Sequence, residues 1–524
     1  MAKRAALMAL ASCFTIAVSA LAEPVSVVEE EVIEDPELAG KKEIKEEAPP
    51  PAGRLNVDLR TRVGVDTRWE NDREEVIEAT EIAAFEVEYP RSEDVTFAVG
   101  LRARHFGGWR NAPGTELDPA ARYELDVVPT AAYVDATLAD GLHTRIGYQV
   151  TALGRFDVFS ASNILLMQDL RSGPASMPGA TEIAQPAVRS DLDIGSSFTL
   201  TSVYVPFFQP DLVDIVGTDY ALFAINDSVP APTPATACAP APDFVAQAGA
   251  AIQERLNATL QSSELTETSR AAFRALAPEP NLTEPQGVMR LTGRSSAGEL
   301  GVTVGTALER LPTLALSRDL RNLFSDPCNT AFLADALTSK EPFFRVLHPR
   351  YSVVAFDGAT DIGPVQVGFE AAHFQNRTLY AGRRGVFPVP GSADMAQLAL
   401  RAELAESDIA ASVEGFGAYA LDEPDDPNLK WMLLENGRFF RGLSAAVRWT
   451  AGRIALELLG LAASGPTYIV APRIEWEALE RFYLELGTIV VEGPAPVAIG
   501  EPETSLGGVY DNVDQVFVGA RWLP

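Results

Sequence analysis

The chain has 524 residues, of which 72 are acidic and 42 are basic, so its formal net charge is −30. This acidic balance excludes nucleic acid as an expected partner, and its simplest role is to keep loops solvated. A hydrophobic content of 47% allows a large core, whereas only four histidines and three cysteines are available for metal or thiol chemistry.

The N-terminal segment has the pattern of a secretory signal peptide. Lys3 and Arg4 precede an apolar run, Ala5 to Ala22, that ends in the small-residue pattern Ala20-Leu21-Ala22. We therefore expect residues 1–22 to be removed before Glu23. Residues 23–53 follow as an acidic stretch that ends in prolines and is expected to be a disordered tail.

Cys13 leaves a second interpretation of the N-terminal segment open, that of a lipoprotein signal peptide. The run from Leu10 to Cys13 resembles a lipoprotein box, in which Cys13 would carry the lipid, but this leaves an unusually short apolar region. If Cys13 leaves with the signal peptide, Cys238 and Cys328 remain. Two cysteines in an exported protein predict one disulfide.

Beyond the leader, no run of about 18 apolar residues predicts a membrane-spanning helix. The nearest approach, Ile454 to Gly465, is interrupted by Glu457 and ended by Pro466. Helical periodicity is scarce, and short alternating segments are abundant. The sequence therefore predicts an all-β protein.

Residues 54 to 69 show the clearest alternation of apolar and polar side chains. One face is apolar, with Leu55, Val57, Leu59, Val63, Val65 and Trp69. The other face is polar, with Asn56, Asp58, Arg60, Arg62, Asp66 and Arg68. Strands alternate faces with a period of two, and lipid outside with an aqueous lumen inside would produce this pattern.

The pattern recurs along the chain with arginine or glutamate on the polar face. The polar positions in these segments are Arg102, Arg104, His143, Arg145, Arg473, Glu475, Glu477, Glu485 and Arg521. Aromatic residues gather towards strand ends, as expected for the interfacial girdles of a membrane barrel. They are Trp69, Phe106, Trp109, Phe207, Phe208, Trp449, Trp476, Phe482 and Trp522.

Turns and connections provide a strand count. Short turns are predicted at Pro90–Glu93, Ala139–Gly141, Asp193–Ser197, Arg294–Gly298, Gly358–Ile362, Ala405–Asp408, Thr450–Arg453 and Ala478–Arg481. Long connections are predicted at 152–182, 209–285, 311–345, 376–395, 421–440 and 492–511. With 183–191 and 198–208 as a hairpin, residues 54–524 form a transmembrane antiparallel β-barrel of about 18 strands, within a range of 16–18.

The longest connection, 209–285, is expected to carry a helical insertion. Asp243 is a suitable N-cap for a helix with an apolar stripe from Phe244 to Leu260, and a second helical piece is expected at Ser269–Leu276. The insertion either caps the rim or folds into the lumen as its constriction, and no other segment is expected to be large and helical enough to fill the lumen. Both Cys238 and Cys328 fall in loops on the same side.

Catalytic and metal-binding patterns are absent from the sequence. The four histidines form no His-Glu-x-x-His motif, and Asp422–Asp426 lacks the ligand spacing of a calcium loop. Gly293–Ala297 resembles a nucleophile elbow but lacks its final glycine and falls in a predicted turn. We therefore expect no enzyme activity and no cofactor.

One stretch resembles a proteobacterial outer-membrane β-barrel family of unknown function. The resemblance rests on Gly147-Tyr148-Gln149, Gly154-Arg155-Phe156-Asp157 and Asp169-Leu170-Arg171, and extends more weakly to Glu299–Gly301 and His348–Arg350. Leu153 stands where the family has tryptophan, and Ile164 where proline is common. The resemblance covers about two thirds of the chain and implies a barrel without implying an activity.

These observations predict a porin-like channel of the outer membrane for passive or weakly selective passage of small solutes, since barrels of 16–18 strands enclose an aqueous channel. The expected partners are outer-membrane lipid, lipopolysaccharide bridged through divalent cations, and the barrel assembly machinery. Transport of hydrophobic or amphiphilic solutes, or a plugged barrel that tethers the envelope through its acidic tail, are the alternatives. The residues expected to line the pore are Arg60, Arg62, Arg102, Arg104, Arg145, Glu475, Glu477 and Glu485.

Overall fold

The computed structural model describes residues 53–67, 76–107, 124–154, 156, 160–170, 182–212, 284–311, 313–326, 329–338, 344–382, 389–432, 434–465, 467–493 and 514–524. The chain divides into two units, Met1–Pro49 and Pro50–Pro524, and every described residue belongs to the second. The predicted signal peptide and nearly all of the acidic tail, as well as both cysteines of the predicted disulfide, lie outside the described residues.

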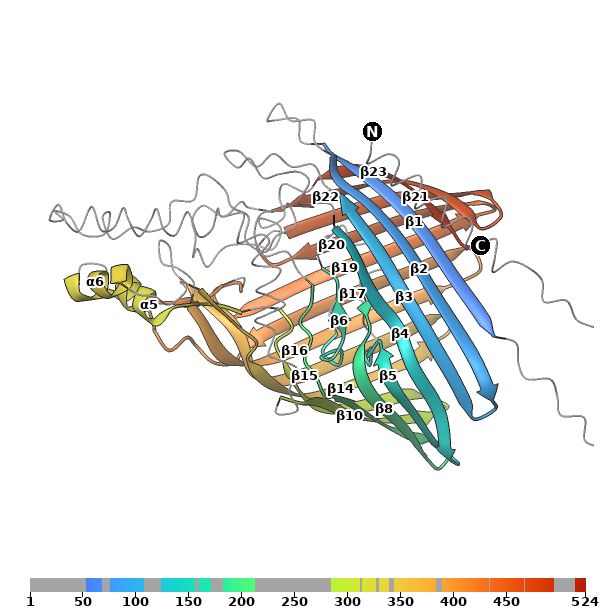
Figure 1. The fold of residues 1–524 in the computed structure, drawn as a ribbon, viewed down its shortest axis with the longest axis horizontal. Coiled ribbons are helices and arrows are strands. Elements are labelled where there is room, and N and C mark those ends of the chain that lie inside the picture. Colours follow the sequence, from blue (N-terminus) through green and yellow to red (C-terminus); the bar gives the residue numbers. More distant parts are fainter. Residues whose placement is uncertain are drawn as a thin grey trace, which may run out of the picture. The chain divides into compact units, whose positions relative to one another are not determined.

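An antiparallel barrel of 18 strands forms this second unit (Figure 1). Each strand pairs with the next, and β1 closes the ring by pairing with β23 from Leu59↔Trp522 to Asp66↔Gln515. Closure leaves no unpaired edge, which is what a sheet inside a membrane requires. The strands are β1 (Arg54–Asp66), β2 (Val76–Ser92), β3 (Val95–Gly107), β4 (Glu124–Ala139), β5 (Leu142–Gln149), β8 (Gln185–Ile194), β9 (Phe198–Val205), β10 (Gln286–Ser295), β11 (Gly298–Leu308), β14 (Arg350–Ile362), β15 (Val365–Gly382), β16 (Val389–Ala405), β17 (Ile409–Ala420), β19 (Phe439–Ala451), β20 (Ile454–Ala463), β21 (Thr467–Leu479), β22 (Phe482–Glu492) and β23 (Gln515–Trp522). The fold class predicted from the sequence is confirmed.

One predicted short turn is misplaced. β14 continues through Gly358 to Ile362, and the chain turns at Gly363, whose φ is 62°. Gly358 allows a close approach of side chains, because a Cβ atom there would lie 2.7 Å from Leu300 Cδ2 and 2.7 Å from Phe369 Cε1. The remaining predicted turns coincide with the junctions between neighbouring strands.

The predicted connection at 376–395 is also too long. After a bulge at Asn376, β15 and β16 continue to pair from Arg377↔Ala393 to Ala381↔Val389. The short strand β18 (Lys430–Trp431) adds to β15 at this extended end. The connection itself is therefore reduced to residues 383–388.

Smaller elements lie in the long connections. Two short hairpins, β6 (Met167–Gln168) with β7 (Glu182–Ile183) and β12 (Thr313–Leu316) with β13 (Phe344–Leu347), accompany α5 (Arg318–Ser325) and α6 (Thr330–Thr338). The sequence analysis did not predict α5, which Ser317 caps by accepting a hydrogen bond from the Leu320 amide. The helices predicted between 243 and 276 lie outside the described residues. Among the helices that the structure does describe, none has the length and apolar character to cross a membrane.

The two faces of the strands reverse the usual arrangement of a soluble protein. Val63 is 38% exposed on the outside of β1, whereas its neighbour Arg62 is 4% exposed on the inside. Large apolar side chains remain exposed around the outer surface, which matches a surface covered by lipid. The alternation found in the sequence is therefore that of a membrane barrel.

The aromatic girdle is confirmed only in part. Trp449, Trp476 and Trp522 are exposed near the short turns, at the end of the barrel called here the turn end. Phe208 is an exception, because it is buried in the opposite, loop end with its ring 4.8 Å from that of His348. Trp69 and Trp109, together with the Phe106 side chain, lie outside the described residues.

Candidate functional site

The predicted pore-lining residues all lie on the inner face of the barrel. Strand alternation places Arg60 and Arg62 on the inside of β1, opposite the exposed apolar residues of the same strand. The others occupy equivalent positions on β3, β5, β21 and β22, namely Arg102, Arg104, Arg145, Glu475, Glu477 and Glu485. Contact with a passing solute remains a prediction for each of them.

Eight of the inward-facing charged residues form two neighbouring ion-pair groups, called here together the charged wall. It occupies the turn-end half of consecutive strands β19, β20, β21, β22, β23 and β1. Its members are Asp58, Arg60, Arg448, Glu457, Arg473, Glu475, Glu485 and Arg521.

Ion pairs connect the charged wall across strand boundaries. Arg448 Nη2 lies 2.9 Å from Glu475 Oε1, and Arg473 bonds to Glu457 while its Nη1 lies 3.5 Å from Glu485 Oε2. The Asp58 carboxylate accepts hydrogen bonds from both Arg60 and Arg521. Because the signs alternate, the wall carries strong local fields with little net charge.

The charged wall remains accessible to solvent from inside the barrel. Its side chains keep between 15% and 45% of their surface exposed, although they face the interior. Charged groups at this exposure are hydrated, and a hydrated interior is the feature that separates a channel from a filled barrel.

Four of the predicted residues have partners outside the charged wall. Arg62 lies over the Phe517 ring, with its guanidinium carbon 4.7 Å from the ring centroid. Arg145 pairs with Asp135 at 2.6 Å and lies over the Tyr133 ring, with its guanidinium carbon 4.2 Å from the ring centroid. Glu477 lies beside the turn and accepts a hydrogen bond from the Arg481 amide. Arg104 pairs at 2.7 Å with Asp169, which belongs to a connecting loop.

That connection, between β5 and β8, folds into the barrel. Its described residues, 151–154, 156 and 160–170, are called here the inward loop. Glu370, in the turn-end half of β15, accepts hydrogen bonds from the Ser160 hydroxyl at 3.2 Å and from the Ser162 amide at 2.5 Å. The loop is therefore fastened to the inner wall between the two ends of this strand.

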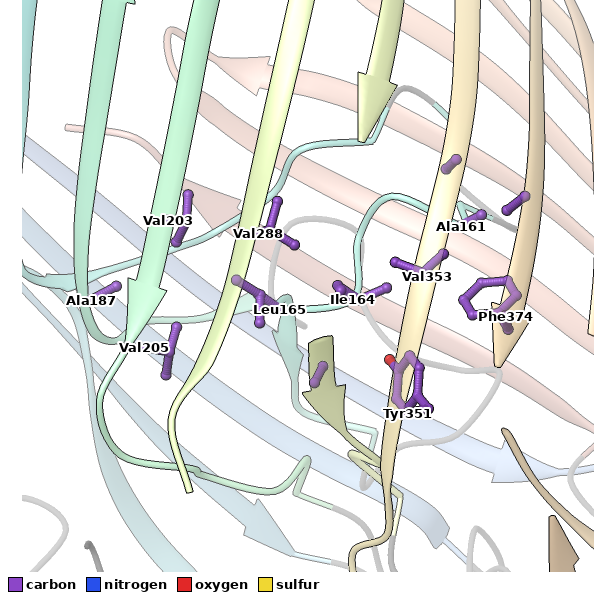
Figure 2. Close-up of a cluster of buried hydrophobic side chains, with 13 residues drawn as sticks. Ala161, Ile164, Leu165, Ala187, Val203, Val205, Val288, Tyr351, Val353 and Phe374 are labelled. Carbon is purple, nitrogen blue, oxygen red and sulfur yellow. The ribbon is translucent and has the colours of Figure 1, made fainter. Parts of the chain in front are cut away.

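Apolar packing holds the same loop against one side of the wall. Ala161, Ile164 and Leu165 are buried in a cluster with inward-facing residues of β8, β9, β10, β11, β14 and β15, as Figure 2 shows for most of its members. Nearer the start of the loop, Phe156 packs against Ala399 of β16 and Phe416 of β17. The loop thus extends along the interior from the β8 side to the β17 side, where Phe440 and Leu461 of β19 and β20 also pack against the Phe156 cluster, and the charged wall lies in the turn-end half beyond it.

A polar hub fixes the base of the inward loop. The buried Arg310 side chain donates from Nη2 to the Leu165 carbonyl at 2.7 Å and to Gln185 Oε1 at 3.0 Å, and from Nη1 to the Gln209 carbonyl at 2.8 Å. Gln185 also donates to Thr151 Oγ1 at 2.7 Å. One guanidinium therefore ties three chain segments together.

Asp211 completes the hub from the start of the longest connection. Its Oδ1 accepts a hydrogen bond from the Gln168 amide at 2.9 Å, and Leu212 pairs with the strand-like end of the inward loop. Burial raises the pKa of Asp211 to about 6, against the opposing effects of Arg310 and of the Gln168 hydrogen bond. Burial likewise lowers the pKa of the nearby His348.

The sequence analysis missed the inward loop. Residues 152–182 were predicted only as a long connection, and 209–285 was the one segment considered large and helical enough to fill the lumen; that prediction for 209–285 remains open. The signal was the apolar run Ile164–Met167 within a predicted outer loop, since such a run needs a surface to cover it. Within the described residues, no group of histidine, cysteine, aspartate and glutamate is arranged to hold a metal ion.

Comparison with known proteins finds similar solved structures but no match by sequence. No family model matches the sequence and no curated protein matches it, so the resemblance to a family of unknown function is not confirmed. Among solved structures, a BenF-like porin from Pseudomonas fluorescens Pf-5 is similar at TM-score 0.46 and 7% identity, over 90% of this chain and 98% of that one.

Two further structures have comparable scores. OccAB3 from Acinetobacter baumannii has TM-score 0.44 and 8% identity over 90% of this chain and 99% of that one. Salmonella typhi OmpF, solved in complex with daunomycin, has TM-score 0.41 and 8% identity over 90% and 97% of the two chains. The porin-like fold of this chain follows from its own strand pairing and apolar outer surface.

Proposed function

We propose that the protein is an outer-membrane channel through which small solutes pass passively or with weak selectivity. One observation carries the proposal: the inward loop is packed against one side of the barrel, and the charged wall beyond it keeps solvent-exposed side chains inside the barrel. Water and ions require such a hydrated path.

The charge pattern supports weak ion selectivity. Arginine and glutamate alternate along the charged wall and neutralise one another in pairs, so neither anions nor cations meet a wall of one sign. Passage would then be limited mainly by the space between the inward loop and the charged wall.

The outer surface supports the accompanying proposals on location and partners. Exposed leucine, valine and tryptophan side chains around a closed barrel support a lipid surrounding, and we propose that the barrel assembly machinery inserts the protein. Lipopolysaccharide and outer-membrane lipid are the expected surroundings of the barrel, and export through a cleaved signal peptide is its expected route. No reaction is proposed for the protein.

Single-channel recording with a blocking reagent tests the channel directly. In a background with Cys238 and Cys328 changed to serine, Glu485→Cys places a thiol on the charged wall, and Leu486→Cys places one on the lipid side of the same strand. A bulky, charged thiol reagent should lower the conductance of the first variant and leave that of the second unchanged.

The same recording also tests the competing function, a plugged structural barrel. A protein that inserts into the bilayer, folds fully and shows no conductance would be a plugged barrel, as expected for a structural tether. Equal sensitivity of both variants to the reagent would contradict the assignment of the charged wall to the conducting path.

A further inference from the structure

The inner face of strand β20 changes from charged to apolar along the strand. Its successive inward residues are Glu457, which belongs to the charged wall, then Leu459 and Leu461. Pairing fixes these orientations, because Glu457 is flanked by Arg448 and Arg473, whereas Leu459 is flanked by Ala446 and Ala471. Charge therefore gives way to apolar surface within one strand.

Leu459 is exposed inside the barrel. It is 39% exposed although it faces the interior, whereas its neighbour Leu458, on the lipid side, is 49% exposed. The small side chains of Ala446 and Ala471 on either side leave its surface open. An exposed leucine in an aqueous lumen offers a contact to solutes with apolar groups.

The apolar surface continues towards the inward loop. Leu461 and Phe440 are partly buried and pack against the cluster of Phe156 and Phe416 at the far end of that loop. We call the surface formed by Phe440, Ala446, Leu459, Leu461 and Ala471 the apolar shelf. It lies between the inward loop and the charged wall, in the part of the barrel that the proposed function assigns to solutes.

The charges beside the shelf occur in both signs. Arg448 and Glu457 flank its turn end on adjacent strands, and Arg448 is 45% exposed at the side chain. Arg448 also reaches Glu475 at 2.9 Å. A solute held there with its apolar part on Leu459 would have a guanidinium and carboxylates within reach of its polar end.

We propose that the apolar shelf and the adjoining charged wall form a subsite for apolar zwitterions, meaning small solutes that carry an ammonium, a carboxylate and an apolar group. This deepens the proposed channel function and rests on it. Alternating charges favour a dipolar solute, because each of its charged groups finds an opposite partner, whereas a simple anion or cation also meets a like charge.

The swelling rate of proteoliposomes measures the preference of the channel for apolar zwitterions over other small solutes. Vesicles with the purified protein are exposed to equal osmolarities of arabinose, L-serine, L-leucine, the apolar carboxylate isocaproate and the uncharged N-acetyl-L-leucinamide. Arabinose entry shows that the channel conducts. Leucine should enter at least as fast as the smaller serine, and faster than isocaproate and N-acetyl-L-leucinamide.

Two adjacent substitutions provide the matched control. Leu459→Ala should lower the leucine-to-serine ratio of entry rates about threefold, whereas Leu458→Ala should leave this ratio and arabinose entry unchanged. The charge-neutral pair Arg448→Gln with Glu475→Gln should remove the preference for leucine over N-acetyl-L-leucinamide.

The possible results of these experiments distinguish failure of the proposed subsite from failure of the proposed channel function. Arabinose entry with rates ordered by size alone, and with no effect of Leu459→Ala, would overturn the subsite while leaving the channel in place. Faster entry of isocaproate than of leucine would replace the zwitterion with an apolar anion. Absence of arabinose entry together with absence of conductance would instead contradict the channel itself.

Discussion

Two sides of the barrel interior differ in how they use polar groups. On the side of β8 to β17, Arg310 and Glu370 are buried and bond to the backbone of the inward loop. On the side of β19 to β1, the residues of the charged wall pair with one another and remain exposed to solvent. The first set holds a chain segment in place, and the second presents charge to the lumen.

This difference predicts opposite effects of mutation. Removing one partner of a buried hydrogen-bonded charge costs several kcal/mol, whereas an exposed ion pair contributes about 0–1 kcal/mol. Substitutions on the loop side should change stability and loop attachment, and substitutions on the charged wall should change selectivity.

The largest effect is expected for Arg310→Ala. It leaves the Gln209 carbonyl and Gln185 Oε1 without this donor and removes one of the donors to the Leu165 carbonyl, so the free energy of unfolding should fall by about 1–3 kcal/mol for each acceptor left unpaired. Denaturant unfolding in detergent measures the loss. Arg350→Ala, which removes an exposed arginine bonded to Pro285 and Glu284, serves as the control and should cost under about 1 kcal/mol.

The pH dependence of loop attachment should be set by Asp211. Because its folded pKa of about 6 exceeds the ordinary 3.8, this group's stabilising contribution is fully present below about pH 3.8 and is lost as the pH rises through 6. The difference corresponds to about 3 kcal/mol. The protection of residues 165–170 from hydrogen exchange, corrected for intrinsic rates, should therefore be greater at pH 4 than at pH 7.

Asp211→Asn provides the comparison, since an amide does not ionise. Exchange at residues 165–170 in this variant should vary little between pH 4 and pH 7 once corrected for intrinsic rates. An unchanged pH dependence would assign the titration to another group, such as His348.

A smaller loss is expected for Glu370→Ala, which leaves the Ser162 amide and the Ser160 hydroxyl without their acceptor. An unpaired buried amide costs about 1–3 kcal/mol. Single-channel conductance should become noisier as the inward loop detaches. Glu403→Ala, on the neighbouring strand and more exposed, should leave the current steady.

The charged wall should respond mainly in selectivity. Glu475→Gln removes one partner of Arg448, and stability should change by less than about 1 kcal/mol because the pair is partly exposed. The loss of one negative charge should shift the reversal potential in a salt gradient towards anion preference. An unchanged reversal potential would show that Glu475 lies off the conducting path.

The smallest effect on folding is expected for replacing Pro242–Pro278 with a short Gly/Ser bridge, since loop length carries a modest entropic cost. These residues lie outside the described part of the chain. Raised conductance after deletion would support a constriction by the insertion, and unchanged conductance and selectivity would support a cap on the rim.

The sequence by itself determined the barrel, its strand number and the inner position of the charged residues. Strand alternation and turn formation depend on neighbouring residues in the sequence. Arg62 and Val63 can therefore be assigned to opposite faces of β1 before the strands that pair with β1 are known. The same local rules failed at Gly358, where glycine serves a close contact between strands and not a turn.

Only the tertiary structure decided which connection enters the barrel and where the lumen turns apolar. The inward loop is fixed by partners far along the chain, such as Ser160 and Glu370 at a separation of 210 residues and Leu165 and Arg310 at 145. Leu459 shares the face of Glu457 by strand alternation, but only its pairing with Ala446 and Ala471 shows that small neighbours leave its surface open inside the barrel. Such contacts depend on how the strands close into a ring, which no local pattern of residues encodes.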